Sequence, residues 1–171
     1  RDMTGFIDGT ENPQFPDDRA EVALLGEDAG VFADGSFIFA QRYCHDLEKW
    51  KKLKVDAQQQ VIGRTKLESI ELDEDVQPEN SHVSRTVVED DAGDEMEILR
   101  HSLPYGDGKG DQGLFFIAYT KDLSIIDAML ERMFGTSGDG IHDRLLHFVT
   151  ALDGAYYFAP SEELLEEVLE D

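Results

Sequence analysis

The chain has 171 residues, which suits one domain, and its 40% hydrophobic content with ten phenylalanines is enough for a core. It carries 38 Asp and Glu against 15 Lys and Arg, a formal net charge of -23, which disfavours binding to nucleic-acid phosphates and to anionic membranes. The acidic excess also fits a protein that works in concentrated salt, where screening weakens self-repulsion.

The first part of the chain predicts one strand followed by two helices. Prolines and acidic residues predict a loop over 13–30, with at most one helical turn over 19–25. Three aromatic residues and a preceding Asp-Gly turn predict a strand over 35–45. An Asp at a capping position and helical apolar spacing then predict helices over 46–53 and 56–66.

The middle part is expected to supply two further strands. Residues 68–80 are acidic and predict an exposed loop, 83–88 alternates only weakly, and 96–103 predicts a strand. The glycine-rich stretch 105–113 predicts a hairpin connection, because its Gly108-Lys109-Gly110 lacks the Ser or Thr of a phosphate-binding loop. The run 114–120 is the most apolar strand.

The last part predicts a helix, a strand and a tail. An apolar stripe over 123–133 with a glycine stop predicts an amphipathic helix, and an Asp-Gly turn leads into a short strand over 155–158. Residues 159–171 form an acidic tail with a helix from Ser161. The order β, α, β, β, α, β predicts an α+β, ferredoxin-like (split βαβ) domain over 1–171, with an antiparallel sheet, helices on one face and an opening loop over 1–34.

The single cysteine, Cys44, excludes an internal disulfide and indicates a reducing, cytoplasmic setting. No apolar run approaches the roughly 20 residues of a membrane-spanning helix, and no signal peptide opens the chain. We therefore expect a soluble cytoplasmic protein. The chain starts directly on a motif at Arg1, which is typical of a cleaved fragment.

The motif Gly5 to Pro13 (GFIDGTENP) places the carboxylate of Asp8 between glycines and apolar residues. Taken alone, the Asp8-Gly9 pair is explained equally well as a simple turn signal. His82 follows a polar loop, but a lone histidine serves many structural purposes, and no pair has the spacing of a zinc site. Asp143 is equally well placed as a helix N-cap, and Arg100 as a strand-surface ion-pair partner.

Together, the Gly5 to Pro13 motif, Asn80-Ser81-His82, the Ile98 to Ser102 strand and Asp143 to Leu146 resemble the C-terminal half of a dye-decolourising (DyP-type) haem peroxidase, nearest its bacterial B-type branch. The likeness covers nearly the whole chain and keeps motif order and spacing. It implies a ferredoxin-like fold, haem b as cofactor, and hydrogen peroxide and a reducing substrate as reactants.

The resemblance also implies roles for residues. His82 would be the proximal haem ligand, with Asp143 accepting a hydrogen bond from its far ring nitrogen. Asp8 would act as acid and base toward peroxide, and Arg100 would stabilise developing negative charge. Ser102 stands where the family often has Asn, so it offers one donor instead of two.

Three residues would lie at the haem edge. Arg64 resembles the propionate-binding arginine. Glu11 and Glu71 occupy positions near it, although exposed surface carboxylates are at least as plausible in so acidic a chain.

The family usually has another ferredoxin-like domain ahead of the Gly5 to Pro13 motif, which is absent from this sequence. An exposed apolar sheet face would follow, so we expect a homo-oligomer or a companion chain. The leading interpretation is a haem-dependent peroxidase. The alternatives are a haem carrier with little turnover and a non-catalytic acidic assembly domain.

Overall fold

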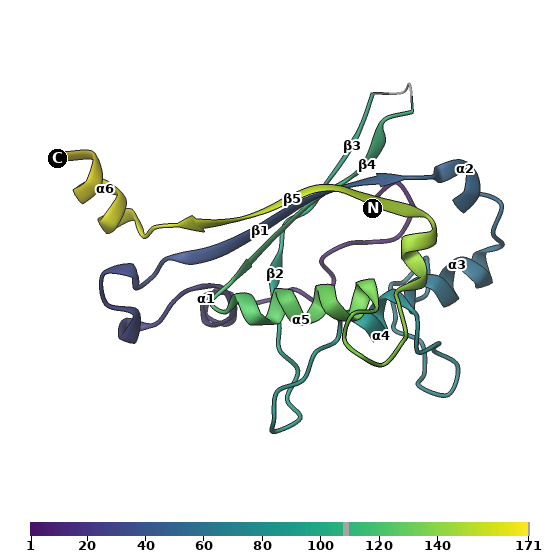
Figure 1. Ribbon diagram of the computed structural model, residues 1–171, viewed down its shortest axis with the longest axis horizontal. Helices are drawn as coiled ribbons and strands as arrows, with labels where there is room; N and C mark the ends of the chain where they lie inside the picture. Colours follow the sequence, from purple (N-terminus) through teal and green to yellow (C-terminus); the bar gives the residue numbers. More distant parts are fainter. Residues whose placement is uncertain (108–109, 171) are drawn as a thin grey trace.

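The computed structural model describes residues 1–107 and 110–170, and its centre is an antiparallel sheet (Figure 1). The strands are β1 (Ser36–His45), β2 (Leu99–Arg100), β3 (Leu103–Gly106), β4 (Gln112–Thr120) and β5 (Val149–Ala159). Their order is β2-β4-β1-β5, with β3 pairing the far end of β4. The two long central strands are thus connected by crossovers, and the predicted ferredoxin-like α+β fold is confirmed.

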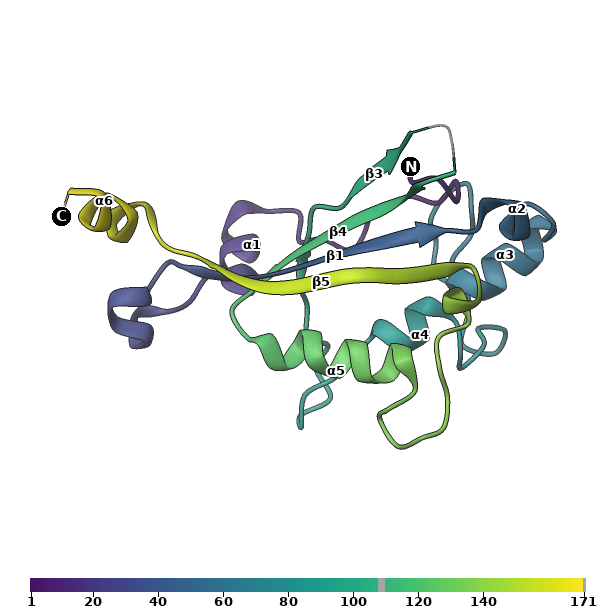
Figure 2. The ribbon, with the colours of Figure 1, turned by 45° about the horizontal axis from the view of Figure 1, so that its top comes forward.

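The helices α3 (Val55–Ile62), α4 (His82–Thr86) and α5 (Leu123–Phe134) lie on one side of this sheet (Figures 1 and 2). The short α2 (Leu47–Trp50) follows β1 directly. The core between sheet and helices contains Phe39, Ile98, Ala118, Ile125 and Ile126. Helices on one face were expected from the sequence.

The longest helix, α5, has both of its ends specified by sequence. Asp122 accepts a hydrogen bond from the Ser124 amide at 2.8 Å as N-cap, and Gly135 ends the helix at φ 74°. Its buried residues Ile126 and Met133 lie on one face, as the apolar stripe predicted.

Strand β5 contains a bulge where the sequence predicted a turn. Arg42 of β1 pairs with Asp153, but the next residue, Tyr43, pairs with Ala151, so Leu152 has no partner of its own. The Asp153-Gly154 pair therefore lies beside an irregularity inside one long strand. Glycine is common in bulges as well as in turns, so the sequence signal fits both.

Other segments differ from expectation in more local ways. The region expected to be loop contains α1 (Pro16–Ala23) and a 3-10 turn, η1 (Glu27–Phe32). The weakly alternating stretch after residue 82 is helix α4, and the expected strand over 96–103 is divided into β2 and the start of β3. The expected hairpin joins β3 to β4, with residues 108 and 109 outside the described part. The tail helix is α6 (Glu162–Glu170), and residue 171 is not among the described residues.

The sheet face turned away from the helices is apolar and open. Directly paired residues share a face, so Leu103 and Phe115 lie on it, as do Ile38 and Tyr157. Leu103 is 62% and Tyr157 58% exposed. None of the helices in the described ranges is long and apolar enough to cross a membrane.

Candidate functional site

A large pocket opens between the sheet, the helices and the N-terminal loop. One part of its wall is apolar and comes mainly from β1, β4 and α5, including Phe39, Phe116, Met129, Leu130 and Met133. The polar part includes most of the residues selected from sequence: Asp8, Glu11, Arg64, Glu71, His82 and Arg100. These side chains come from distant parts of the chain, and the fold brings them to one cavity.

His82 is held by a buried carboxylate. Its Nδ1 lies 2.6 Å from Oδ2 of Asp143, whose side chain is fully buried, while the His82 side chain is 27% exposed. A carboxylate oxygen at this position favours the tautomer that carries its proton on Nδ1, and in that neutral ring Nε2 keeps its lone pair. His82 lines the pocket, so its imidazole is available there in one tautomer. A metal ion that takes a single protein ligand needs a histidine oriented in this way.

The backbone around His82 is equally constrained. It is the first residue of α4, and the N-cap Ser81 accepts a hydrogen bond from the Ser84 amide at 3.2 Å. The Thr86 hydroxyl donates to the His82 carbonyl at 2.9 Å. The imidazole is thus fixed from its ring and from its main chain.

Asp143 fills both roles that the sequence left open. Its Oδ1 accepts a hydrogen bond from the Leu145 amide at 2.7 Å, as the N-cap of the 3-10 turn η2 (Arg144–His147). Its other oxygen contacts His82. The capping bond fixes the carboxylate orientation, and so positions the imidazole.

The motif loop is anchored so that Asp8 reaches the pocket. Phe6 is 5% exposed and packs edge-on against Trp50 at 6.2 Å between ring centroids. Asp2 accepts hydrogen bonds from the Phe6 amide at 3.1 Å and from Thr4. Gly9 has φ +74°, a conformation that side chains rarely adopt. Phe6 is therefore the apolar anchor of the loop that carries the Asp8 carboxylate.

Asn12 joins this loop to the strand that carries Arg100. Its Oδ1 accepts from the Arg100 amide at 2.9 Å, and its Nδ2 donates to the Arg100 carbonyl at 2.7 Å. Sequence reasoning missed Asn12, because its partner lies 88 residues away. The pair of bonds fixes the relative position of the Asp8 loop and β2.

The guanidinium of Arg100 forms no ion pair with any residue of the described ranges. This observation disfavours the strand-surface ion pair considered from sequence. A half-buried cation that lines a pocket without a direct ion pair in the described ranges is available to an anionic ligand.

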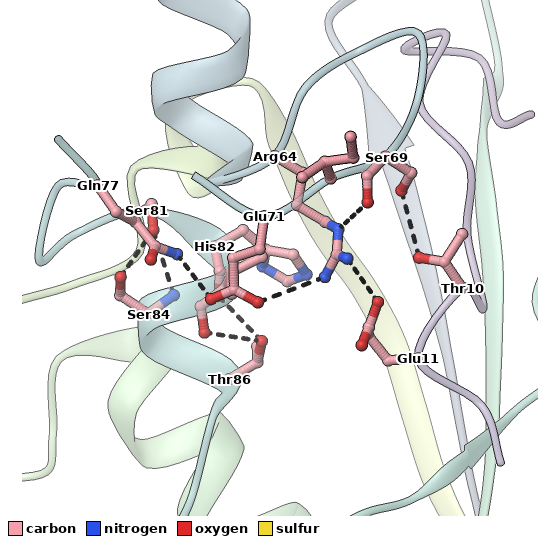
Figure 3. A network of polar contacts seen from close by, with 12 residues as sticks. Thr10, Glu11, Arg64, Ser69, Glu71, Gln77, Ser81, His82, Ser84 and Thr86 are labelled. Atoms are coloured by element: carbon pink, nitrogen blue, oxygen red, sulfur yellow. Dashed lines mark hydrogen bonds and ion pairs between the residues drawn. The ribbon is translucent and has the colours of Figure 1, made fainter. Parts of the chain in front are cut away.

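Arg64 lies at the centre of a polar network at the pocket edge (Figure 3). Its Nη2 is 2.5 Å from Glu11 and its Nη1 is 3.6 Å from Glu71, while its Nε donates to the Ser69 carbonyl at 2.8 Å. Its side chain is only 14% exposed. The structure therefore brings together the residues selected for this edge.

Glu95 also lines the pocket and was not selected from sequence. Burial raises its pKa, the charges of Glu97, Glu71 and Glu11 raise it further, and Arg100 opposes them. In the sequence, Glu95 and Glu97 are acidic residues at alternate positions, and this pattern was the signal that could have identified Glu95. The pocket thus has several carboxylates close enough to affect one another.

Two further side chains of β1, those of Tyr43 and His45, line the pocket. Burial lowers the pKa of His45, against the charge of Asp2, and its Nδ1 has no hydrogen-bond partner in the described ranges. Burial raises the pKa of Tyr43 far above its usual range, and the charge of Asp143 adds to this.

Ser102 is not among the pocket-lining residues. Its Oγ is buried and has no hydrogen-bond partner in the described part of the chain. The geometry therefore leaves it beside the pocket wall, two residues beyond Arg100.

Known proteins match this chain over almost its whole length. A family model described as Dyp-type peroxidase, C-terminal, matches residues 1–164. The dye-decolorizing peroxidase of Mycobacterium tuberculosis is 42% identical over 167 residues, which are 97% of this chain and 50% of that protein.

Solved structures agree with the sequence comparison. The dye-decolorizing protein from V. cholerae is 51% identical, with a TM-score of 0.90 over 98% of this chain and 54% of that chain. A variant of Rhodococcus jostii DypB in complex with heme is 46% identical, with a TM-score of 0.92 over 97% of this chain and 54% of its own. This chain spans about half the length of these relatives.

Proposed function

Because the chain belongs to the Dyp-type peroxidase family, we propose that it forms the haem-binding half of a peroxidase that reduces hydrogen peroxide at the expense of an electron donor. The observation that carries the proposal is the 2.6 Å contact between His82 Nδ1 and Asp143, in a pocket that Asp8 and Arg100 also line. A heme complex of a relative supports the choice of cofactor.

The residues present fit a haem. A porphyrin needs apolar walls, one axial ligand and a cation for its propionates. The sheet and α5 would supply the walls, Nε2 of His82 would be the ligand atom, and Arg64 would be the cation, since all of them line the same pocket. The Arg64–Glu71 distance of 3.6 Å is the longer of its two ion pairs, so a propionate would replace Glu71. The single cysteine does not line the pocket, which supports non-covalent haem b.

When bound, the haem would supply the electrons that cleave the O–O bond of peroxide. The residues of this chain would transfer the proton and stabilise the developing charge. Asp8 would take the proton from one peroxide oxygen and deliver it to the other, which leaves as water. Arg100 would stabilise the negative charge that develops on the leaving oxygen, since it has no ion pair with the described residues to give up. Asp143 would hold His82 in the tautomer that binds iron.

The decisive experiment is a visible absorption spectrum of the protein with added haem. We expect a Soret band that is lost in His82→Ala. Arg100→Leu should retain the band but react slowly with peroxide, because only the distal charge is removed. A Soret band that persists unchanged in His82→Ala would overturn the proposal, and a fast peroxide reaction in Arg100→Leu would overturn the role of that cation.

The partners follow from the open sheet face. Its exposed Leu103 and Tyr157 support coverage by a companion domain or by another copy of the chain. Light scattering of the purified chain distinguishes monomer from oligomer. The single Cys44 supports a cytoplasmic location.

A further inference from the structure

Two exposed histidines face each other outside the pocket. His142 precedes the cap of η2 and His147 ends that turn. Their Nε2 atoms are 3.1 Å apart, and their ring centroids are 5.2 Å apart with an angle of 55° between the rings. Neither residue lines the pocket, so the peroxidase site does not account for the pair.

The spacing matches that of two imidazoles on one metal ion. With zinc–nitrogen bonds of about 2.05 Å, two ligand nitrogens lie about 3.3 Å apart in a tetrahedral site and about 2.9 Å apart in a square-planar one. The observed 3.1 Å lies between these values. Rotation of the two exposed rings would direct both lone pairs at a shared ion, which would replace the proton in the N–H···N hydrogen bond.

We propose that His142 and His147 bind a divalent transition-metal ion of the zinc or copper class, and that the bound ion clamps the turn that holds Asp143. Imidazole is a preferred ligand of these ions. No cluster of three or more potential ligands occurs among residues 1–107 and 110–170, so water would complete the coordination.

The clamp would act on a short and well-anchored segment. The Lys49 ammonium donates to the His147 carbonyl at 2.8 Å, which holds one end of the turn. Between the two histidines, Asp143 caps the Leu145 amide at 2.7 Å with one oxygen and contacts His82 at 2.6 Å with the other. An ion across His142 and His147 would therefore restrict the carboxylate that orients His82. The net charge of -23 also raises the local concentration of cations.

Calorimetric titration of the haem-free protein with zinc chloride, and then with copper chloride, tests the binding step. His142→Gln and His147→Gln should each weaken the binding at least about tenfold, because losing even an indirect partner of a metal ligand costs 10- to 100-fold. Copper should bind more tightly than zinc. The matched control is His101→Gln, since His101 is exposed but packs against Tyr119 at 6.3 Å, and it should leave the affinity unchanged.

Hydrogen exchange tests the clamp. Zinc should slow exchange of the Leu145 and Phe148 amides in the unaltered protein, and it should have no effect there in His142→Gln. An anomalous difference peak between the two Nε2 atoms in zinc-soaked crystals would locate the ion without any variant.

Undiminished zinc binding in both histidine variants would overturn the site, and so would an absence of binding. Binding without a change in exchange would overturn the clamp. All these measurements are made without haem, so their failure is distinct from failure of the proposed function.

Discussion

Replacing Asp143 by Asn tests whether the buried carboxylate controls His82, the proposed haem ligand. Asn is nearly as good an N-cap as Asp, so the bond to the Leu145 amide should survive. The charge that fixes the tautomer of His82 is lost. The substitution therefore isolates the 2.6 Å contact between Asp143 and His82 from the capping role.

Two independent estimates give a similar size for the effect. Loss of a partner behind a metal-binding histidine lowers affinity about 10- to 100-fold, which is about 1.4–2.8 kcal/mol. A hydrogen bond to a charged group contributes about 1.5–3 kcal/mol. We therefore expect Asp143→Asn to bind haem about 10- to 100-fold more weakly than the unaltered protein.

The assay is a haem titration followed by Soret absorbance, with thermal unfolding of the haem-free protein beside it. Asp122→Asn is the matched control, because Asp122 caps α5 through the Ser124 amide at 2.8 Å and does not line the pocket. It should bind haem as the unaltered protein does. Equal affinities in Asp143→Asn and the unaltered protein, or equal losses in both variants, would refute the reasoning.

Further predictions concern the motif loop and the charged pocket. Asn12→Ala removes two hydrogen bonds to the Arg100 backbone and should lower the free energy of unfolding in urea by about 2 kcal/mol. Gly9→Ala and Gly138→Ala both force a side chain into positive φ, at about 1 kcal/mol. Gly9→Ala should lose more, because its new Cβ would also lie 3.1 Å from Asn12 Nδ2, whereas Gly138 has open space; equal losses would contradict this. The raised pKa of Glu95 means that the folded protein binds the extra proton, so stability falls as pH rises through that pKa. Glu95→Gln should remove this loss, and so be the more stable protein at neutral pH but not well below the usual pKa of 4.5; urea titrations at both pH values decide. Finally, the net charge of -23 predicts that added salt raises the melting temperature of the unaltered protein.

The sequence predicted the elements whose signals are local. The aromatic residues of β1 and the capped, striped helix α5 specify their structure within a few residues, and both lie close to the expected positions. Helix α4 was missed because its five residues are too few to show a helical period. The local sequence signal for α4 was its N-cap residue, Ser81.

The pocket was harder to predict because its geometry is tertiary. Sequence motifs could nominate Asp8, His82 and Arg100, but not that Arg100 would lack an ion pair or that Asn12 would hold its backbone. Asp143 shows the same limit. Its cap and its contact with His82 looked like alternatives from sequence, whereas a carboxylate has two oxygens and uses one for each.

The unpaired Leu152 in β5 determines which way the two ends of that strand face. Val149 lines the pocket, and seven positions later Tyr156 packs on Phe39 and donates to Asp127 of α5. Residues an odd number of positions apart point to opposite sides of a regular strand. The added residue places Val149 and Tyr156 on the same face of the sheet. Deletion of Leu152 would therefore turn the side chains of one end of β5, either the pocket end or the end that contacts α5, to the opposite face.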